Sequence, residues 1–388
     1  TMQNNIQEES NYGLTQNKFI NDLIDKPEIS LECNSENIES NGFSSKKEII
    51  VKVKVLSASK DIKTINLYQN KKLINNSNRG FKYIDKSKKE FSFTLSLSNG
   101  NNEIKAIAID EGLVESEPVK INIKYAGIEQ KPNLFIIAIG INEYKNPKYS
   151  LNYAVADAKG IADEINRHSP QLYNSCKVSL LSNEEANRDN ILELFDMHIK
   201  ETKEQDVFVF YFAGHGVIND APNQQYYILP FDVTQMYGDN KLLNTKGISA
   251  QELQSLSQNI KAQKQLFILD ACQSGGMVES LVLRGTTEEK AIAQLARSTG
   301  TYWLTASGSE QFATEFESLG HGVFTYAILQ GLKGEADGGE GDKKITVKEI
   351  SSFLNDRVPE LSEKYKGQAQ YPTSYGYGQD FPIVIIKE

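Results

Sequence analysis

Two apolar stretches of this 388-residue chain each end beside a side chain that can take part in covalent chemistry. Residues 206–213 lead to His215, and residues 265–269 lead to Cys272. Neither stretch alternates polar and apolar residues, which is typical of strands covered on both faces in a parallel sheet. In open sheets of this kind, the carboxyl ends of the strands form the ligand crevice. We therefore expect His215 and Cys272 to meet at one edge of a sheet, although they lie far apart in the chain.

The chemistry that this pair could perform is nucleophilic attack by a thiolate. A cysteine near its ordinary pKa is mostly protonated at neutral pH, so a nucleophilic cysteine needs a base or a cation beside it. His215 could supply either. Gly216 follows it directly and a Gly-Gly pair follows Cys272 closely, so backbone could approach a substrate at both places. The N–H groups of Gly216 and Cys272 are the candidate donors to an oxyanion.

The alternative is that His215 and Cys272 have only a structural role, since free cysteines are commonly buried and inert. We favour chemistry because each lies among glycines after an apolar run. For the other histidines and cysteines the structural interpretation prevails. We expect His321 to anchor the start of a helix through hydrogen bonds and His168 and His198 to lie on the solvated surface. The two remaining cysteines, Cys33 and Cys176, should take no part.

Four segments, in this order, resemble the caspase-like superfamily of cysteine peptidases, and within it the metacaspase, paracaspase and bacterial orthocaspase branch: residues 152–158, 211–216, 270–275 and 321–327. The caspase signature is Gln-Ala-Cys-x-Gly with a histidine about 50 residues upstream. This chain keeps Ala271-Cys272 but has Asp270 in place of the glutamine and one more residue before the glycine. The resemblance covers about residues 131–388. It implies a cysteine endopeptidase that acts on proteins or peptides.

The resemblance also bears on specificity. Caspases cleave after aspartate and line their first specificity pocket with arginines, but the position where they carry one is Leu151 here. Metacaspase-like and paracaspase-like enzymes carry two aspartates instead, which match Asp157 and Asp270. A desolvated carboxylate pair favours a cation and repels an acid. We expect cleavage after arginine, whose planar fork can bond both carboxylates, and then after lysine. Each aspartate could instead be a structural acid that caps a helix or turn.

Two rival interpretations stay open: a catalytically silent caspase-like scaffold whose β-domain binds a partner, and a peptidase with acidic specificity. Self-processing is a further hypothesis. Arg284 precedes a glycine in the segment 277–299, and exposed loops are preferred sites of cleavage. Arg284 is therefore the candidate self-cleavage site.

The chain divides into three predicted parts. Residues 1–26 are polar and should form a flexible arm. Residues 27–126 hold short alternating segments separated by turns, which predicts a β-sandwich that resembles immunoglobulin-like modules, without their Cys-Trp-Cys signature. Its expected strands are 49–55, 64–68, 91–97, 103–109 and 119–123. A regulatory protein partner could bind this domain.

Residues 131–388 alternate strand and helix patterns, which predicts an α/β domain: a caspase-like, mostly parallel sheet with helices on both faces. The first strand should be 134–140, and 381–386 could add a terminal one. The expected helices are 154–167, 189–200, 250–259, 324–332 and 347–358.

Composition excludes several function classes. The chain has 42 basic and 51 acidic residues, a net charge of −9, which argues against nucleic acid as a partner. No apolar run is long enough to span a membrane, and three cysteines make no disulfide framework. The first residues lack the regions of a signal peptide, so we expect a cytoplasmic protein, with a removed signal left open.

No metal or other cofactor is expected. The acidic segment 335–342 resembles a calcium loop, but glycines stand where an EF-hand needs ligands and Lys348 stands where it needs the bidentate glutamate. Activation by calcium through a looser site stays open.

Overall fold

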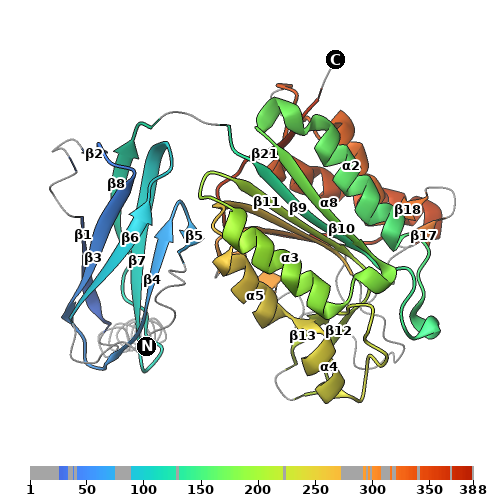
Figure 1. Ribbon diagram of the computed structural model, residues 1–388, viewed down its shortest axis with the longest axis horizontal. Coiled ribbons are helices and arrows are strands. Elements are labelled where there is room, and N and C mark those ends of the chain that lie inside the picture. Colours follow the sequence, from blue (N-terminus) through green and yellow to red (C-terminus); the bar gives the residue numbers. More distant parts are fainter. Residues whose placement is uncertain are drawn as a thin grey trace, which may run out of the picture. The chain divides into compact units, whose positions relative to one another are not determined.

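The computed structural model describes residues 26–33, 38, 42–74, 89–127, 131–221, 224–271, 292–293, 296–297, 299–306, 315–316, 320–338, 341–367 and 369–386. The chain forms two compact units, one of Thr1–Gln69 and Ile74–Gly127 and the other of Asn70–Leu73 and Ile128–Glu388 (Figure 1). The predicted arm lies outside the described residues except for Lys26.

The first unit is a pair of mainly antiparallel β-sheets. One sheet has the strand order β1-β3-β6, and within this unit the other has the order β2-β8-β7-β4. Alternate residues of both sheets point into one core, which includes Val51, Val53, Leu67, Ile104 and Ala106. This confirms the predicted β-rich unit; its relation to immunoglobulin-like modules stays a prediction. The strands of this unit are β1 (Glu28–Cys33), β2 (Phe43–Ser44), β3 (Glu48–Ser57), β4 (Ile62–Gln69), β6 (Glu90–Ser96), β7 (Gly100–Asp110) and β8 (Val119–Tyr125), while β5 (Lys72–Leu73) belongs to the residues of the second unit.

The second unit is built on a six-stranded sheet with the order β10-β9-β11-β15-β16-β20. All neighbours are parallel except β16 and β20. Every residue of the neighbouring inner strands β9 and β11 is buried, as their unbroken apolar sequences predict. The strands are β9 (Leu134–Gly140), β10 (Cys176–Ser182), β11 (Val207–Ala213), β15 (Lys264–Asp270), β16 (Tyr302–Thr305) and β20 (Thr373–Gly376).

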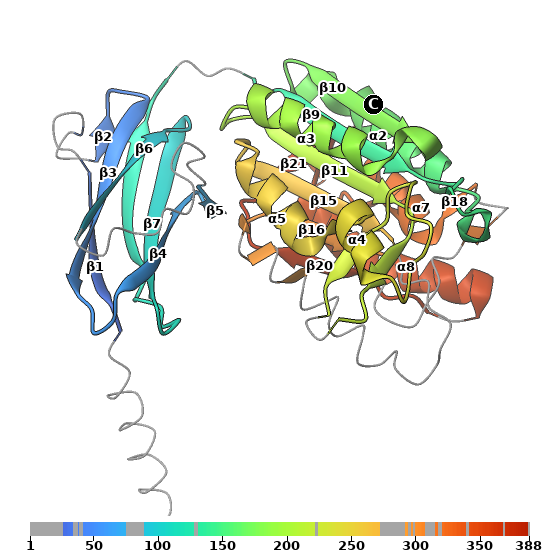
Figure 2. The same cartoon turned by 60° about the horizontal axis from the view of Figure 1, so that its bottom comes forward.

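Helices cover both faces of this sheet (Figures 1 and 2). The helices α2 (Ala154–Leu172), α7 (Val323–Gln330) and α8 (Val347–Lys366) share a core with Ile136, Tyr211 and Leu266. On the other face α3 (Arg188–Glu201) and α5 (Ala250–Asn259) share a core with Phe210 and Phe267. The predicted mostly parallel sheet with helices on both faces is therefore confirmed.

Smaller elements complete the second unit. The expected terminal strand is present but pairs with β19, not with the main sheet. The helix predicted over 324–332 ends earlier and continues as a π-helical turn. These elements are η3 (Pro147–Tyr149), η4 (Asn183–Glu185), β12 (Gly216–Ile218), β13 (Tyr226–Ile228), α4 (Asn240–Lys246), β14 (Ile248–Ser249), β17 (Glu315–Phe316), β18 (His321–Gly322), η5 (Gly331–Glu335), β19 (Lys344–Thr346) and β21 (Pro382–Ile385).

Two histidines expected on the surface lie elsewhere. His198 is fully buried between the rings of Phe135 and Phe208, and burial lowers its pKa. It continues the apolar stripe of α3 formed by Ile191 and Phe195, a helical spacing that outweighs the charged neighbours. The side chain of His168 is only 12% exposed. Its two ring nitrogens lie 3.1 Å from the Ile385 carbonyl oxygen and from Glu164 Oε1.

Within the described residues, no helix is both long and apolar enough to cross a bilayer.

Gly140, at the end of β9, supports the placement of the first turn of α2. A Cβ atom there would lie 2.7 Å from the carbonyl carbon of Ala154, and backbone cannot move aside cheaply. We expect Gly140→Ala to lower the free energy of unfolding by about 1–3 kcal/mol, as overpacked cores do. Calorimetric thermal unfolding measures this. Gly338→Ala is the control, because among the described residues its Cβ would meet only one atom, at 3.8 Å. Equal stability of the two variants would contradict the steric account.

Candidate active site

The carboxyl ends of β11 and β15 lie side by side at one edge of the sheet. Ala213 is the register partner of Asp270, and Gly214 N donates to the Asp270 carbonyl at 3.2 Å. His215 therefore lies beside the strand end that leads, through Ala271, to Cys272. Cys272 itself lies outside the described residues, as does Arg284.

The ring of His215 is oriented by a backbone carbonyl. Its Nε2 lies 2.8 Å from the carbonyl oxygen of Tyr149. Because a carbonyl only accepts, Nε2 must carry the hydrogen of this bond. In the neutral imidazole, Nδ1 is then the nitrogen that can take up a proton.

The backbone of His215 is held by Tyr144, a residue that the sequence did not single out. His215 N donates to the Tyr144 hydroxyl at 2.8 Å, and this hydroxyl donates to the Leu229 carbonyl at 3.2 Å. The two rings lie 5.0 Å apart, and burial raises the pKa of Tyr144, which keeps it a donor. A Cβ at Gly214 would lie 2.6 Å from the Tyr144 oxygen, so a glycine is needed for this close approach.

The N–H of Gly216 points away from the neighbouring strand. Leu229 N donates to the His215 carbonyl at 2.9 Å, and Gly216 is opposite Ile228 in the antiparallel pairing of β12 with β13. Hydrogen-bonded and non-hydrogen-bonded positions alternate in such a pair, so the Gly216 N–H faces outward. This direction suits a donor to an oxyanion.

Asp157 lies in the first turn of α2 and is only 4% exposed. One of its oxygens, Oδ1, lies 2.7 Å from His321 Nδ1, and Gly322 N donates to both oxygens at 3.2 Å. The start of α2 is held at the sheet edge by Asn142, whose Oδ1 accepts from Val155 N at 2.9 Å.

Asp270 ends β15 and is 6% exposed. Its Oδ2 accepts a 2.6 Å hydrogen bond from the hydroxyl of Thr325, in the first turn of α7. The Thr325 hydroxyl lies 2.5 Å from that of Tyr211. Since Thr325 gives its hydrogen to the carboxylate, Tyr211 must donate to Thr325. Burial, then the charges of Asp270 and Asp157, raise the pKa of Tyr211 well above its usual value, so it keeps that hydrogen.

The two aspartates face the same small space. A Cβ placed on Gly322 would lie 3.2 Å from Asp157 Oδ2 and 3.3 Å from Asp270 Oδ2. The fold thus brings together two carboxylates that come from different elements, and one of them, Asp270, ends the strand next to the one that leads to His215. His321 precedes α7, as expected, but its partner is Asp157. The pattern that could have revealed this is a histidine directly before a glycine at a helix start.

The described residues contain no group of three His, Cys, Asp or Glu side chains that could hold a metal. In the acidic segment near η5, Asp337 Oδ2 accepts from Lys343 N, and Asp342 pairs with Lys344 at 2.8 Å. These carboxylates are bonded to groups of their own loop.

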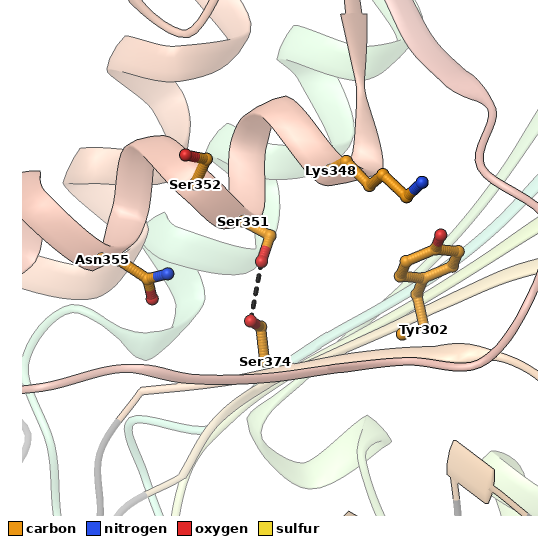
Figure 3. A pocket seen from close by; sticks show the side chains of 7 residues that line it. Tyr302, Lys348, Ser351, Ser352, Asn355 and Ser374 are labelled. Atoms are coloured by element: carbon orange, nitrogen blue, oxygen red, sulfur yellow. Dashed lines mark hydrogen bonds between the residues drawn. The ribbon is translucent and has the colours of Figure 1, made fainter.

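A separate polar pocket of about 280 Å³ lies between α8 and the edge strand β20 (Figure 3). Ser351 Oγ donates to Ser374 Oγ at 2.7 Å inside it. Tyr302, whose pKa is raised to about 12 by burial and then by Asp380, is the first residue of β16. The pocket therefore does not lie at the carboxyl ends of the parallel strands. It is lined by Tyr302, Lys348, Ser351, Ser352, Asn355, Ser374 and Gly376.

Comparisons with solved structures give distant similarities. A protein from Geobacter sulfurreducens is 17% identical, with 66% of this chain and 100% of that chain covered and a TM-score of 0.45. Fibronectin(III)-like modules of Clostridium thermocellum CbhA are 18% identical over 28% of this chain and 51% of theirs, with a TM-score of 0.21. No curated protein sequence matches the chain.

The family described as "Caspase domain" matches residues 135–378, more than half of the chain. The match contains the whole of β11 and β15 and all of β9 except Leu134, so it covers the carboxyl ends of the strands at the candidate site. The chain therefore belongs to the caspase-like superfamily of cysteine peptidases.

Proposed function

We propose that this peptidase is an endopeptidase of the metacaspase and orthocaspase type, which cleaves proteins after arginine and, less readily, after lysine. The observation that carries the proposal is the pair of buried carboxylates of Asp157 and Asp270, which face one space at Gly322. Such a space favours a cation over an acidic side chain.

In the proposed reaction, Cys272 and His215 form the catalytic dyad. The Cys272 thiolate attacks the scissile carbonyl carbon, and the carbonyl oxygen takes the negative charge of the tetrahedral intermediate. The N–H groups of Gly216 and Cys272 donate to that oxygen. His215 protonates the leaving amine and then takes a proton from the water that hydrolyses the acyl-enzyme. The Tyr149 carbonyl on Nε2 supports this role, because it leaves Nδ1 as the nitrogen that exchanges the proton.

Arginine fits the proposed pocket better than lysine for a geometric reason. Its guanidinium carries donors on several nitrogens in a rigid plane, so it can bond one oxygen of each aspartate. An ammonium is a compact charge and is more strongly hydrated. The pocket residues come from α2 and β15, so their separation is set by packing and not by local sequence.

Self-cleavage after Arg284, activation by calcium and a protein partner for the first unit stay predictions. The silent-scaffold alternative is less well supported, because the sequence retains both Cys272 and His215. A scaffold would bind a partner but would neither turn over an arginyl substrate nor react with an arginyl electrophile.

The first test compares fluorogenic peptides that differ only in having Arg, Lys or Asp before the scissile bond. We expect the Arg peptide to be cleaved faster than the Lys peptide and the Asp peptide not to be cleaved. Cys272→Ala and His215→Ala should lose activity. Each measurement is made with and without calcium. Preference for Asp would overturn the proposed specificity, and absence of all turnover and of labelling at Cys272 would favour the scaffold.

The second test neutralises the pocket. Asp157→Asn and Asp270→Asn each remove one charged acceptor, and hydrogen bonds to charged groups contribute about 1.5–3 kcal/mol. We expect kcat/KM for the arginyl peptide to fall about 10–100-fold in each variant. Asp342→Asn, an exposed carboxylate paired with Lys344, is the matched control. A fall as large in the control as in the pocket variants would argue against a pocket role.

The third test concerns Tyr144 as a positioning residue for His215. Tyr144→Phe leaves the His215 N–H and the Leu229 carbonyl without this partner, which costs about 1–3 kcal/mol for each buried group. We expect a lower kcat with KM little changed, because the substrate pocket is untouched. Tyr173→Phe is the control, since Tyr173 is also buried and donates to the Pro382 carbonyl, on β21. Equal kcat in both variants would count against positioning.

A further inference from the structure

The segment His321–Thr325, from β18 into the first turn of α7, bonds both aspartates of the proposed pocket. We infer that this segment determines the selectivity for arginine, and that Gly322 is a specificity-determining residue that keeps the space between the carboxylates open for a guanidinium. The inference rests on the proposed function and goes beyond it by assigning residues outside the aspartate pair.

The first observation is that one short segment fixes two acids from separate elements. Asp157 receives the His321 ring and the Gly322 N–H, at 2.7 and 3.2 Å. Asp270 receives the Thr325 hydroxyl at 2.6 Å. Each aspartate therefore has an oxygen held by this segment. The start of α7 therefore helps to set the distance between the carboxylates, together with the packing of α2 and β15.

The second observation is the reason for glycine at position 322. Its backbone angles, φ −62° and ψ 147°, are extended and open to any residue. Conformation therefore does not require glycine, but space does. A methyl group would lie 3.2 and 3.3 Å from the Oδ2 atoms of Asp157 and Asp270, closer than ordinary contact. It would occupy the space that a bound cation needs.

The size of the substrate's cation decides whether kcat/KM falls more for the Arg or for the Lys peptide when position 322 carries a methyl group. A guanidinium is a broad plane that must reach both carboxylates at once, whereas an ammonium can bond one of them as a compact charge. A methyl group at position 322 should therefore lower kcat/KM for the Arg peptide more than for the Lys peptide. The ratio of the two kcat/KM values reports this directly, and a merely structural defect would lower both alike.

His321 acts as a positioning residue in this arrangement. The carboxylate of Asp157 only accepts, so His321 Nδ1 carries the hydrogen of their bond. The ring also lies against α2, because a Cβ at Gly160 would be 3.1 Å from its Cε1. An asparagine places its amide nitrogen where Nδ1 lies, so His321→Asn should keep the bond that His321→Ala loses.

The experiment measures kcat/KM for matched Arg and Lys peptides in the wild type, Gly322→Ala and the control Gly338→Ala. We expect the Arg value to fall about 10–100-fold in Gly322→Ala, with a lower Arg/Lys ratio, and no change in Gly338→Ala. Binding of agmatine, a guanidinium probe, to Cys272→Ala with and without Gly322→Ala gives a readout independent of catalysis. Agmatine should bind Cys272→Ala and bind the double variant more weakly.

The outcomes separate the two levels of the proposal. If the wild type cleaves after Arg but Gly322→Ala keeps the same Arg/Lys ratio and agmatine affinity, the inference is overturned and the proposed function stands. If the wild type cleaves no basic substrate and Cys272→Ala binds no agmatine, both the inference and the proposed function are contradicted.

The His321 variants decide the matter if Gly322→Ala fails to fold, as thermal unfolding would show. His321→Ala should raise KM for the arginyl peptide about tenfold, and His321→Asn should restore most of the loss. An unchanged KM in folded His321→Ala would refute the role of the segment.

Discussion

Two carboxylates held close together in a buried place are the constraint on which the site depends. Moving an ionised carboxylate out of water costs several kcal/mol unless hydrogen bonds or opposite charges compensate. For Asp157 and Asp270 part of that compensation comes from His321, Gly322 and Thr325, all at the start of α7. The arrangement therefore couples the position of one helix to the electrostatics of the proposed pocket.

The rest of the second unit serves to bring these parts to one edge. Parallel pairing aligns the ends of β9, β11 and β15, and the apolar faces of the strands are covered by helices on both sides. Close approaches at that edge are possible because glycines replace side chains. Gly214 admits the Tyr144 hydroxyl, and Gly140 admits the first turn of α2.

Much of this fold could be predicted because its main signals are local. The unbroken apolar strand β9 and the helix α5 were predicted at their observed bounds. The edge strand β10 was missed because its half-exposed sequence mixes polar and apolar residues. The predicted surface position of His198 is wrong because its place on the apolar stripe of α3 decides its burial, and the charged residues beside it in the sequence lie on other faces of the helix.

The sequence by itself determined the family, the alternation of the main strands and helices, and which strand ends carry His215 and Asp270. Periodic patterns of apolar residues and short motifs each lie within a single element, so they can be recognised along the chain. Only the tertiary structure decided that Tyr144 holds the His215 backbone and that His321 and Thr325 bond the two aspartates. These contacts join residues from different elements, and no local pattern specifies the distance between side chains that packing alone brings together.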